Sequence, residues 1–564
     1  MPRIAIARGL DSTERAESST LTPVPGWTYA DVLESVAASI PDAPALLHGG
    51  RATTWAELDK RADGLAAYLL DAGCKHQDKV AFYLYNRPEY LELFTACSKA
   101  SLVHVNTNYR YADEELFYIW DNADAVAVVF QGTFTDVVER IRHRLPAVHT
   151  WLWVDDGTAP CPTWATPYET AAATPNEGRV RSPRGRDGDD LVLLYTGGTT
   201  GLPKGVMWRQ DDLFCVTDKA NRVPLPADND LGADGLSPAV RARTSKPGPL
   251  SLPACPLMHG TGLFNALNTL ALGGSVVTMQ QTRFDVEEFL DVIQDAGVKS
   301  TFIVGDAFAK PILKALDAEP NRWDISSLRV IISSGVMWSS ESKQGLLRHN
   351  EALILVDAFG SSEAVGMGSS VSSGADAAKT ATFTLSPESV VITDDGRLVE
   401  PGSDEMGKVG LRGRTPVGYY KDPEKSATTF PTIDGVRYSV PGDFATIGAD
   451  GTINLLGRGS VCINSGGEKI FPEEVEEVLK LHPGIDDAVA VGIPDDRFGQ
   501  AVTAVVQAGP GLDEADVIAH VKSHLAAYKA PKRIFAVDDL ERAANGKADY
   551  KRWTSHATEL SGLT

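Results

Sequence analysis

The regular alternation of helix-like and strand-like hydrophobic periods most strongly constrains the fold of this 564-residue chain. Thr54 and Glu57 form a capping-box pattern that opens a helix of apolar residues at helical spacing. An apolar strand over 80–84 follows, then a helix opened by Pro88 and a second strand over 102–105. Units of this kind predict βαβ crossovers, and therefore parallel sheets with both faces covered.

The length of the chain and a change of pattern near residue 458 predict two domains. A single hydrophobic core stops growing well below 564 residues. After residue 458, a helix opened by Pro472, strands over 488–493 and 501–507 and a helix near 514–526 form a small α+β unit. We therefore expect an α/β protein with a large N-terminal domain of layered mixed sheets and a small C-terminal domain. The predicted limits are a lead-in over 1–26, the large domain over 27–457 and the small domain over 458–564.

Residues 223–253 break the alternation. The segment is rich in Pro, Gly, Ser and Asp and has little periodicity. A loop of this length inside a compact domain is usually functional or mobile. We expect a surface insertion near the mouth of an active site.

Composition limits the partners and the location. The formal charge of −22 argues against nucleic acid, because an acidic surface repels phosphates. The six cysteines are widely spaced and form no Cys-x-x-Cys pair, which favours a reducing cytoplasm. The longest apolar runs, such as 125–130, are of strand length, so we expect no integral membrane segment.

The strongest local motif is an apolar strand over 191–195 that runs into a loop rich in Gly and Thr over 196–205. Glycines let backbone N–H groups converge on an anion, while hydroxyls and a lysine add donors and charge. This pattern predicts a polyphosphate site, although a flexible surface loop is the alternative. A Walker loop would need Ser or Thr after the lysine, and Gly205 stands there instead. The candidate ligands are Thr196, Gly197, Gly198, Thr199, Thr200, Gly201 and Lys204.

This loop resembles the signature of the adenylate-forming superfamily, which contains acyl-CoA synthetases, firefly luciferase and peptide-synthetase adenylation domains. Further segments resemble the superfamily's other motifs in the right order. They are Asp357-Ala-Phe-Gly-Ser-Ser-Glu363, Tyr438-Ser-Val-Pro-Gly-Asp443, Gly457-Arg458 with the segment from Ser465, and Gly546-Lys547. The resemblance spans most of the chain and implies ATP, Mg²⁺ and coenzyme A as cofactor and co-substrates.

The resemblance implies nucleotide contacts that the residue types can make. Glu363 is the expected Mg²⁺ ligand, assisted by the hydroxyl of Thr200. Asp443 and Arg458 suit the ribose hydroxyls, although they could also form an ordinary surface ion pair. Phe359 offers an aromatic face to adenine. The other expected nucleotide-site residues are Gly335, Val336, Asp357, Gly360, Ser361, Ser362, Gly466 and Gly467.

Lys547 is the expected catalytic residue, because attack of a carboxylate on the α-phosphate builds negative charge that an ammonium can stabilise. His259 matches the histidine that lines the acyl pocket in relatives, with a structural histidine as the alternative. In the superfamily the small domain rotates on a hinge between adenylation and thiolysis. Ser460 occupies the hinge position, and Gly466 and Gly467 would border the thiol tunnel.

Some residues depart from the superfamily pattern. Gly197 replaces the commoner Ser or Thr, Ser460 replaces Asp or Lys, and the sequence before Gly546 differs from the usual Pro-Arg-Thr type. These departures look similar to actinobacterial enzymes for sterol side-chain or other bulky and fatty acids. The small residues at Gly262, Gly305, Gly366 and Gly368 predict room for a medium-to-long or ring-bearing acid.

The expected function is therefore an AMP-forming acyl-CoA synthetase whose partners are a small-molecule carboxylic acid, ATP and coenzyme A. The short stretch after Lys547 leaves no room for a fused carrier domain, but loading of a free carrier protein stays open. A noncatalytic adenylate sensor is the alternative from another class. The sequence leaves the oligomeric state open, including a homodimer.

Overall fold

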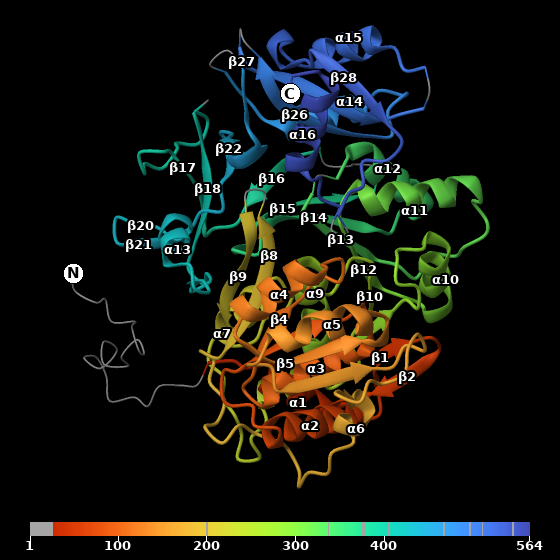
Figure 1. Cartoon of the computed structure of the whole chain (residues 1–564), viewed down its shortest axis with the longest axis vertical. Coiled ribbons are helices and arrows are strands. Elements are labelled where there is room, and N and C mark those ends of the chain that lie inside the picture. Colours follow the sequence, from red (N-terminus) through yellow and green to blue (C-terminus); the bar gives the residue numbers. More distant parts are fainter. Residues whose placement is uncertain are drawn as a thin grey trace.

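A computed structural model describes most of the chain. The described residues are 26–198, 201–336, 338–374, 379–403, 405–465, 468–495, 498–509, 511–543 and 546–563. Except for Gly26, the expected lead-in lies outside them. The chain is mixed α/β, with a large N-terminal domain and a small C-terminal domain that sits above it in Figure 1.

The described part of the large domain contains two extended sheets. One is eight-stranded, in the spatial order β19 (Gly418–Tyr419), β9 (Gly201–Arg209), β8 (Leu191–Gly198), β4 (Val103–Asn106), β3 (Lys79–Tyr83), β5 (Ala125–Gln131), β6 (Thr150–Val154) and β7 (Thr166–Pro167). The other is 15-stranded, in the order β2 (Arg51–Thr54), β1 (Pro44–His48), β11 (Ser275–Thr278), β10 (Leu250–Pro253), β12 (Ser300–Ile303), β13 (Val330–Ser334), β14 (Ile354–Ser361), β15 (Ala364–Ser373), β16 (Thr382–Leu385), β23 (Thr452–Arg458), β22 (Asp443–Ile447), β18 (Met406–Arg412), β21 (Val436–Ser439) and β20 (Thr432–Ile433), with β17 (Ser389–Ile392) paired to β18.

Helices pack around and between these sheets (Figure 1). The helices of the large domain are α1 (Tyr29–Ser39), α2 (Trp55–Asp71), α3 (Pro88–Lys99), α4 (Asp113–Asn122), α5 (Thr135–Ile141), α6 (Tyr168–Ala172), α7 (Gln210–Asp218), α8 (Pro238–Arg243), α9 (Gly260–Ala271), α10 (Val286–Ala296), α11 (Asp306–Ala318), α12 (Ser340–His349) and α13 (Pro423–Thr429). The predicted βαβ unit is confirmed, because β3 and β4 pair in parallel across α3. The capping box of α2 is also confirmed: Glu57 N–H donates to the Thr54 hydroxyl and Thr54 N–H donates to the Glu57 carboxylate.

The glycine-rich segment forms a hairpin where we expected an open loop. β8 continues through Gly198 and pairs antiparallel with β9, so that Thr196 lies opposite Lys204. Val206 and Trp208, two residues apart on β9, are fully buried. This period of two is typical of a strand with one buried face, and it explains why β9 runs back alongside β8.

The segment 223–253 lies largely at the surface, as expected, but it is not without regular structure. It contains α8 and ends in β10, a strand of the 15-stranded sheet. The backbone N–H of Ser237 donates to the Ser35 hydroxyl at 2.9 Å, and Val240 is fully buried, so α8 is docked against α1. The Pro and Asp residues that suggested a loop flank this short helix in the sequence.

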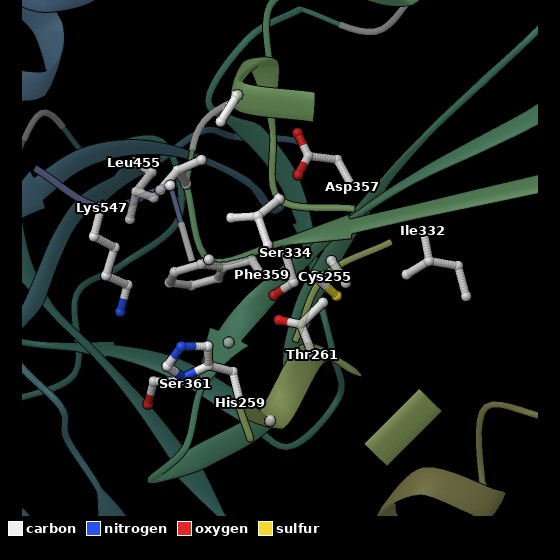
Figure 2. Close-up of a pocket in the computed structure, with 18 of the residues that line it drawn as sticks. Cys255, His259, Thr261, Ile332, Ser334, Asp357, Phe359, Ser361, Leu455 and Lys547 are labelled. Carbon is white, nitrogen blue, oxygen red and sulfur yellow. The ribbon is translucent and has the colours of Figure 1, made fainter. Parts of the chain in front are cut away.

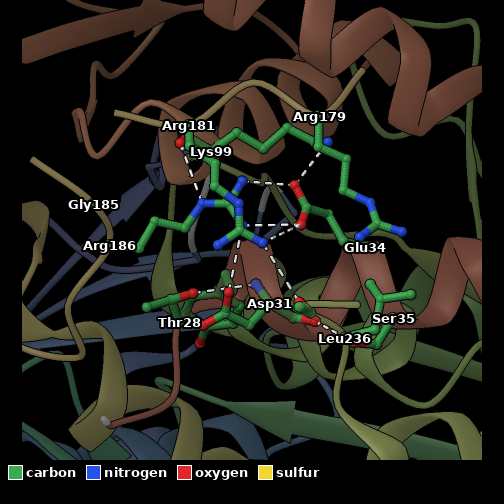
Figure 3. Close-up of polar contacts among 12 residues, drawn as sticks. Thr28, Asp31, Glu34, Ser35, Lys99, Arg179, Arg181, Gly185, Arg186 and Leu236 are labelled. Carbon is green, nitrogen blue, oxygen red and sulfur yellow. Dashed lines mark hydrogen bonds and ion pairs between the residues drawn. The ribbon is translucent and has the colours of Figure 1, made fainter. Parts of the chain in front are cut away.

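A buried ion cluster fastens α1, α2 and α3 together. The Lys99 ammonium has no solvent exposure and lies 3.1 Å from Glu34, 2.8 Å from Asp59 and 2.8 Å from Asp63. Arg186 adds a second cation and contacts Glu34 at 2.6 Å (Figure 3). Burial alone would raise the pKa of Glu34, but hydrogen bonding to Arg186 and the charge of Lys99 lower it to about 2.

The small domain is built on a five-stranded sheet with its own hydrophobic cores. The sheet consists of β25 (Glu468–Ile470), β24 (Ile463–Ser465), β27 (Gly499–Gln507), β26 (Asp487–Asp495) and β28 (Arg533–Val537). The helices are α14 (Pro472–Lys480), α15 (Glu514–His524) and α16 (Tyr550–Leu560). The predicted helices opened by Pro472 and near 514–526 and the two predicted strands are confirmed. β28 and α16 had not been predicted.

Between the two domains the chain makes one short 3₁₀ turn, η3 (Gly459–Val461). Along the chain, the last strand of the 15-stranded sheet is β23, which ends at Arg458, and the first strand of the small sheet is β24, which begins at Ile463. No helix within the described ranges combines the length and the apolar character that crossing a bilayer requires.

Candidate active site

A cavity of about 1530 Å³ lies where the small domain meets the large one. The large domain contributes the end of β8, parts of α7 and α11, one face of α9, β13 to β16, β22 and β23. The small domain contributes α14 and the segment that carries Lys547. Figure 2 shows the Lys547 ammonium and the His259 imidazole directed into the same space, near Ser361 and the ring of Phe359.

Most of the predicted site residues line this one cavity, although they come from distant parts of the chain. They are Thr196, His259, Gly335, Val336, Asp357, Phe359, Gly360, Ser361, Ser362, Glu363, Asp443, Arg458 and Lys547. Gly197, Gly198 and Gly201 belong to the hairpin ends of β8 and β9. Thr199, Thr200, Gly466 and Gly467 lie outside the described residues.

Asp443 and Arg458 face each other across two neighbouring strands. They are register partners in the antiparallel pair β22 and β23, and Arg458 Nε lies 3.1 Å from Asp443 Oδ1. The charge of Asp443 raises the pKa of Arg458 above its usual value. The pair therefore presents a fixed acceptor and a fixed donor to the cavity, which is the combination that two adjacent hydroxyl groups can bind.

Glu363 is half-buried and held by residues that sequence analysis had missed. The Tyr419 hydroxyl donates to Glu363 Oε1 at 2.9 Å, and the Ser439 hydroxyl donates to the Glu363 carbonyl at 2.6 Å. Burial and the nearby Glu363 carboxylate raise the pKa of Tyr419, so its proton stays available. No local sequence pattern marks Tyr419, because its strand β19 has only two residues and forms only by pairing with β9.

The donor set at Glu363 fits Mg²⁺ shared with a substrate. The described residues contain no cluster of three or more His, Cys, Asp or Glu side chains that could hold a metal by themselves. Mg²⁺ is commonly held by one or two carboxylates together with phosphate oxygens and water. A single carboxylate that lines the cavity is consistent with that arrangement.

Arg542 anchors Gly546, the residue directly before Lys547. Arg542 Nη1 donates to the Gly546 carbonyl at 3.1 Å and Nη2 to the Asp487 carboxylate at 2.8 Å. Lys547 itself is open to the cavity. The surrounding protein, and next the charge of Arg458, lower the pKa of Lys547 to about 8, while Glu363 and Asp443 oppose that change. Its ammonium is therefore electrostatically coupled to all three of these groups.

His259 is a neutral imidazole at the start of α9. It occupies the N-cap position without a capping side-chain hydrogen bond. Desolvation, then the positive charges of Lys547 and Arg110, lower its pKa to about 3. Arg110, another residue that sequence analysis missed, donates to the Arg542 carbonyl at 3.1 Å and so joins the two domains.

Two further predicted ligands, Asp357 and Lys204, also have side-chain partners within the protein. Asp357 is buried and accepts a hydrogen bond from Lys343 at 3.1 Å, and burial raises its pKa to about 6. Lys204 forms an ion pair with Asp422 and lies 5.8 Å from the centre of the Tyr419 ring. Lys204 is not among the described residues that line the cavity, and a phosphate would have to compete with Asp422 for its ammonium.

Phe359 and Gly335 shape the wall on which a base could lie. Phe359 is 7% exposed and packs against Phe383 with ring centres 5.3 Å apart. Gly335 has a φ of +102°, a conformation that side chains rarely adopt, and it is exposed next to the end of β13. A residue with a Cβ would be strained there, so glycine keeps the backbone in this position.

Comparisons with known proteins agree with this geometry. A family model described as AMP-binding enzyme matches residues 33–420, and the model of the AMP-binding enzyme C-terminal domain matches 474–547. The chain is 39% identical to a medium/long-chain-fatty-acid–CoA/3-oxocholest-4-en-26-oate–CoA ligase of Mycolicibacterium smegmatis, over 94% of this chain and 96% of the relative. It is 38% identical to a 3-oxocholest-4-en-26-oate–CoA ligase of Rhodococcus rhodochrous, over 94% and 96%. ATP-bound MatB of Rhodopseudomonas palustris is similar in structure, with a TM-score of 0.78, 25% identity and coverage of 94% of this chain and 99% of that one.

Proposed function

This chain belongs to the family of AMP-binding enzymes, and from that premise we propose that it is an AMP-forming acyl-CoA ligase. Its substrates are a medium- or long-chain fatty acid, or a bulky acid such as a sterol side-chain acid, together with ATP and coenzyme A. The reaction yields acyl-CoA, AMP and pyrophosphate through an acyl-adenylate. The names of relatives that share 37–39% of their residues with the chain over almost its whole length support this substrate class.

The observation that carries the proposal is that Lys547 lines the same cavity as Asp443, Arg458 and Glu363, although these residues come from distant parts of the chain. In the adenylation step the carboxylate of the acid attacks the α-phosphate and pyrophosphate leaves. Negative charge then builds between two anions, and a preorganised ammonium stabilises it. We assign this role to Lys547, the ribose hydroxyls to Asp443 and Arg458, and the adenine face to Phe359.

Mg²⁺ would be held by Glu363 with the phosphates of ATP, with Thr200 as a further ligand, and would neutralise phosphate charge. His259, neutral at physiological pH, would line the carboxylate end of the acid without adding charge. We assign the phosphates to the hairpin residues from Thr196 to Lys204.

We also propose that the chain divides at residues 457 and 458 and that Ser460, within η3, is the hinge of the small domain. The change of sheet between Arg458 and Ile463 supports this division. Rotation there would remove Lys547 from the cavity and let the thiol of coenzyme A approach past Gly466 and Gly467. A cytoplasmic location is consistent with six widely spaced cysteines that lack a Cys-x-x-Cys pair.

The test is turnover of purified protein with ATP, Mg²⁺ and acetate, octanoate, palmitate or a cholestenoate-type acid, each with and without coenzyme A. We expect sustained AMP release that requires coenzyme A, with the longer acids preferred over acetate. Sustained AMP release that does not depend on coenzyme A would mean that another acceptor, such as water, takes the acyl group, and would overturn coenzyme A as the required acceptor. No AMP with any acid would overturn the proposal and leave an adenylate sensor.

A further inference from the structure

One wall of the cavity follows a single face of α9. The helix begins directly after His259, and Thr261, Phe264, Asn265 and Asn268 line the cavity at spacings of three and four residues. At 1.5 Å per residue, Asn268 lies about 13 Å along the helix from His259. The cavity therefore extends from the reacting end to a region near Asn268 that is remote from the chemistry.

Two amide side chains meet in that region. Asn221, which follows α7, donates through Nδ2 to Asn268 Oδ1 at 2.9 Å, and Asn268 Nδ2 donates back to Asn221 Oδ1 at 3.1 Å. Asn221 Nδ2 also donates to Asp218 Oδ1 at 3.0 Å, so both of its hydrogens are used. Within the ranges that the structure describes, the second Nδ2 hydrogen of Asn268 has no acceptor. Both asparagines are half-buried and line the cavity.

Other parts of the cavity lining leave room for a bulky group. Val216 and Val365 add apolar surface, and no atom of the described residues lies within 4 Å of the position that a Cβ would take at Gly366. A plain alkyl end that reached Asn268 would displace water from its N–H without replacing the hydrogen bond, which is unfavourable. A keto oxygen at the same place would accept that hydrogen bond.

We propose that Asn268, oriented by Asn221, is a specificity-determining residue that donates a hydrogen bond to an acceptor oxygen at the far end of the acyl group. The inference rests on the proposed acyl-CoA ligase function and deepens it. The preferred substrates are long or ring-bearing acids with a distal keto group. Sites built to hydrogen-bond a substrate group discriminate against analogues that lack it.

The experiment compares kcat/KM for three ring-bearing acids with the same skeleton, which carry a distal ketone, a distal hydroxyl or no distal oxygen. We expect the wild-type enzyme to prefer the keto acid over the oxygen-free acid by roughly tenfold, the value of one net hydrogen bond. Asn268→Leu should abolish this preference and leave octanoate activation unchanged. Asn268→Asp, which replaces the donor by an acceptor, should shift the preference from the keto acid to the hydroxy acid.

Asn265→Leu is the matched control, because Asn265 lines the same face one turn nearer His259 but donates to the Thr261 carbonyl of its own helix. This control should keep the keto preference. Equal kcat/KM for the three acids in the wild type, or equal losses for all acids in Asn268→Leu, would overturn the inference while octanoate turnover leaves the proposed function intact. If the wild type activates no acid, the proposed function fails and the inference fails with it.

Discussion

At the residue scale, the candidate site depends on charges that are fixed before a ligand arrives. Asp443 and Arg458 hold each other at 3.1 Å, and Tyr419 holds Glu363 at 2.9 Å. Arg542 holds the residue before Lys547 through the Gly546 carbonyl. Preorganised groups of this kind need little rearrangement during the reaction, which is why they stabilise a transition state more than water does.

Replacement of Lys547 by alanine should lower the rate of acyl-adenylate formation by roughly a hundredfold to a thousandfold. The side chain is open to the cavity, so the melting temperature should stay unchanged. The measurement is pyrophosphate release with ATP and octanoate, with Lys551→Ala on the exposed side of α16 as the control. Full adenylation by Lys547→Ala would refute the role of this residue.

The same ammonium predicts a pH dependence. The pKa of Lys547 is lowered to about 8, and the charged form is the active one. Adenylation kcat/KM, which reports the free enzyme, should therefore be full below pH 8 and fall as the pH rises through 8. His259, with a pKa of about 3, should add no ionisation between pH 5 and 9. A profile that stays flat to pH 10 would contradict this assignment.

At the scale of elements, the ion cluster around Lys99 connects α2 and α3, which the sequence had predicted one by one, with α1, which it had not. Lys99 belongs to α3, Glu34 to α1, and Asp59 and Asp63 to α2. Removing one partner of a buried ion pair leaves uncompensated charge, which costs far more than the loss of a surface pair. The packing of α1 to α3 therefore depends on one fully buried ammonium.

Lys99→Met keeps the length of the side chain and removes its charge. We expect a loss of about 3–5 kcal/mol in the free energy of unfolding, because three carboxylates lose their common partner. Urea denaturation measures the change, and Lys60→Met on the exposed face of α2 should have almost no effect. A loss no greater than that of the control would show that the carboxylates are balanced by other groups, Arg186 above all.

The lowered pKa of Glu34 makes the stability of the ion cluster depend on pH. It is lowered from 4.5 to about 2, so the stabilising charge is complete above pH 4.5 and is lost as the pH falls toward 2.

At the scale of the whole molecule, two bodies with separate cores enclose one cavity. The small domain has its own apolar clusters, made only of residues after 462. Arg110 with Arg542, and Lys310 with Asp486, are hydrogen-bonded contacts between the domains. A few polar contacts of this kind suit an interface that opens and closes.

A chain shortened to residues 26–458 should therefore fold alone and unfold cooperatively, because it keeps the cores of the large domain. It should still bind ATP through Asp443 and Arg458, but its adenylation rate should fall to that of Lys547→Ala in the full chain. Scanning calorimetry measures the unfolding, titration calorimetry measures ATP binding, and pyrophosphate release measures the adenylation rate. Adenylation well above the Lys547→Ala rate would show that the small domain is not needed for the first step.

The amino-acid sequence by itself determined the local elements and the order of the motifs. The capping box of α2, the proline that opens α3 and the strand periods of the small domain are properties of neighbouring residues, so they can be seen without a partner. The residues that line the cavity could be named because their motifs resemble those of a known family. Some of the chemistry also depends only on the residue type: Arg458 donates hydrogen bonds and Asp443 accepts them in any fold.

The tertiary structure alone decided which side chains are already engaged. Lys204 pairs with Asp422 across 218 positions, and Tyr419 reaches Glu363 across 56. Neither pair leaves a periodic trace in the sequence, because both form only when strands from different parts of the chain are brought into register. The reciprocal amides of Asn221 and Asn268 arise in the same way, from the packing of α7 against α9.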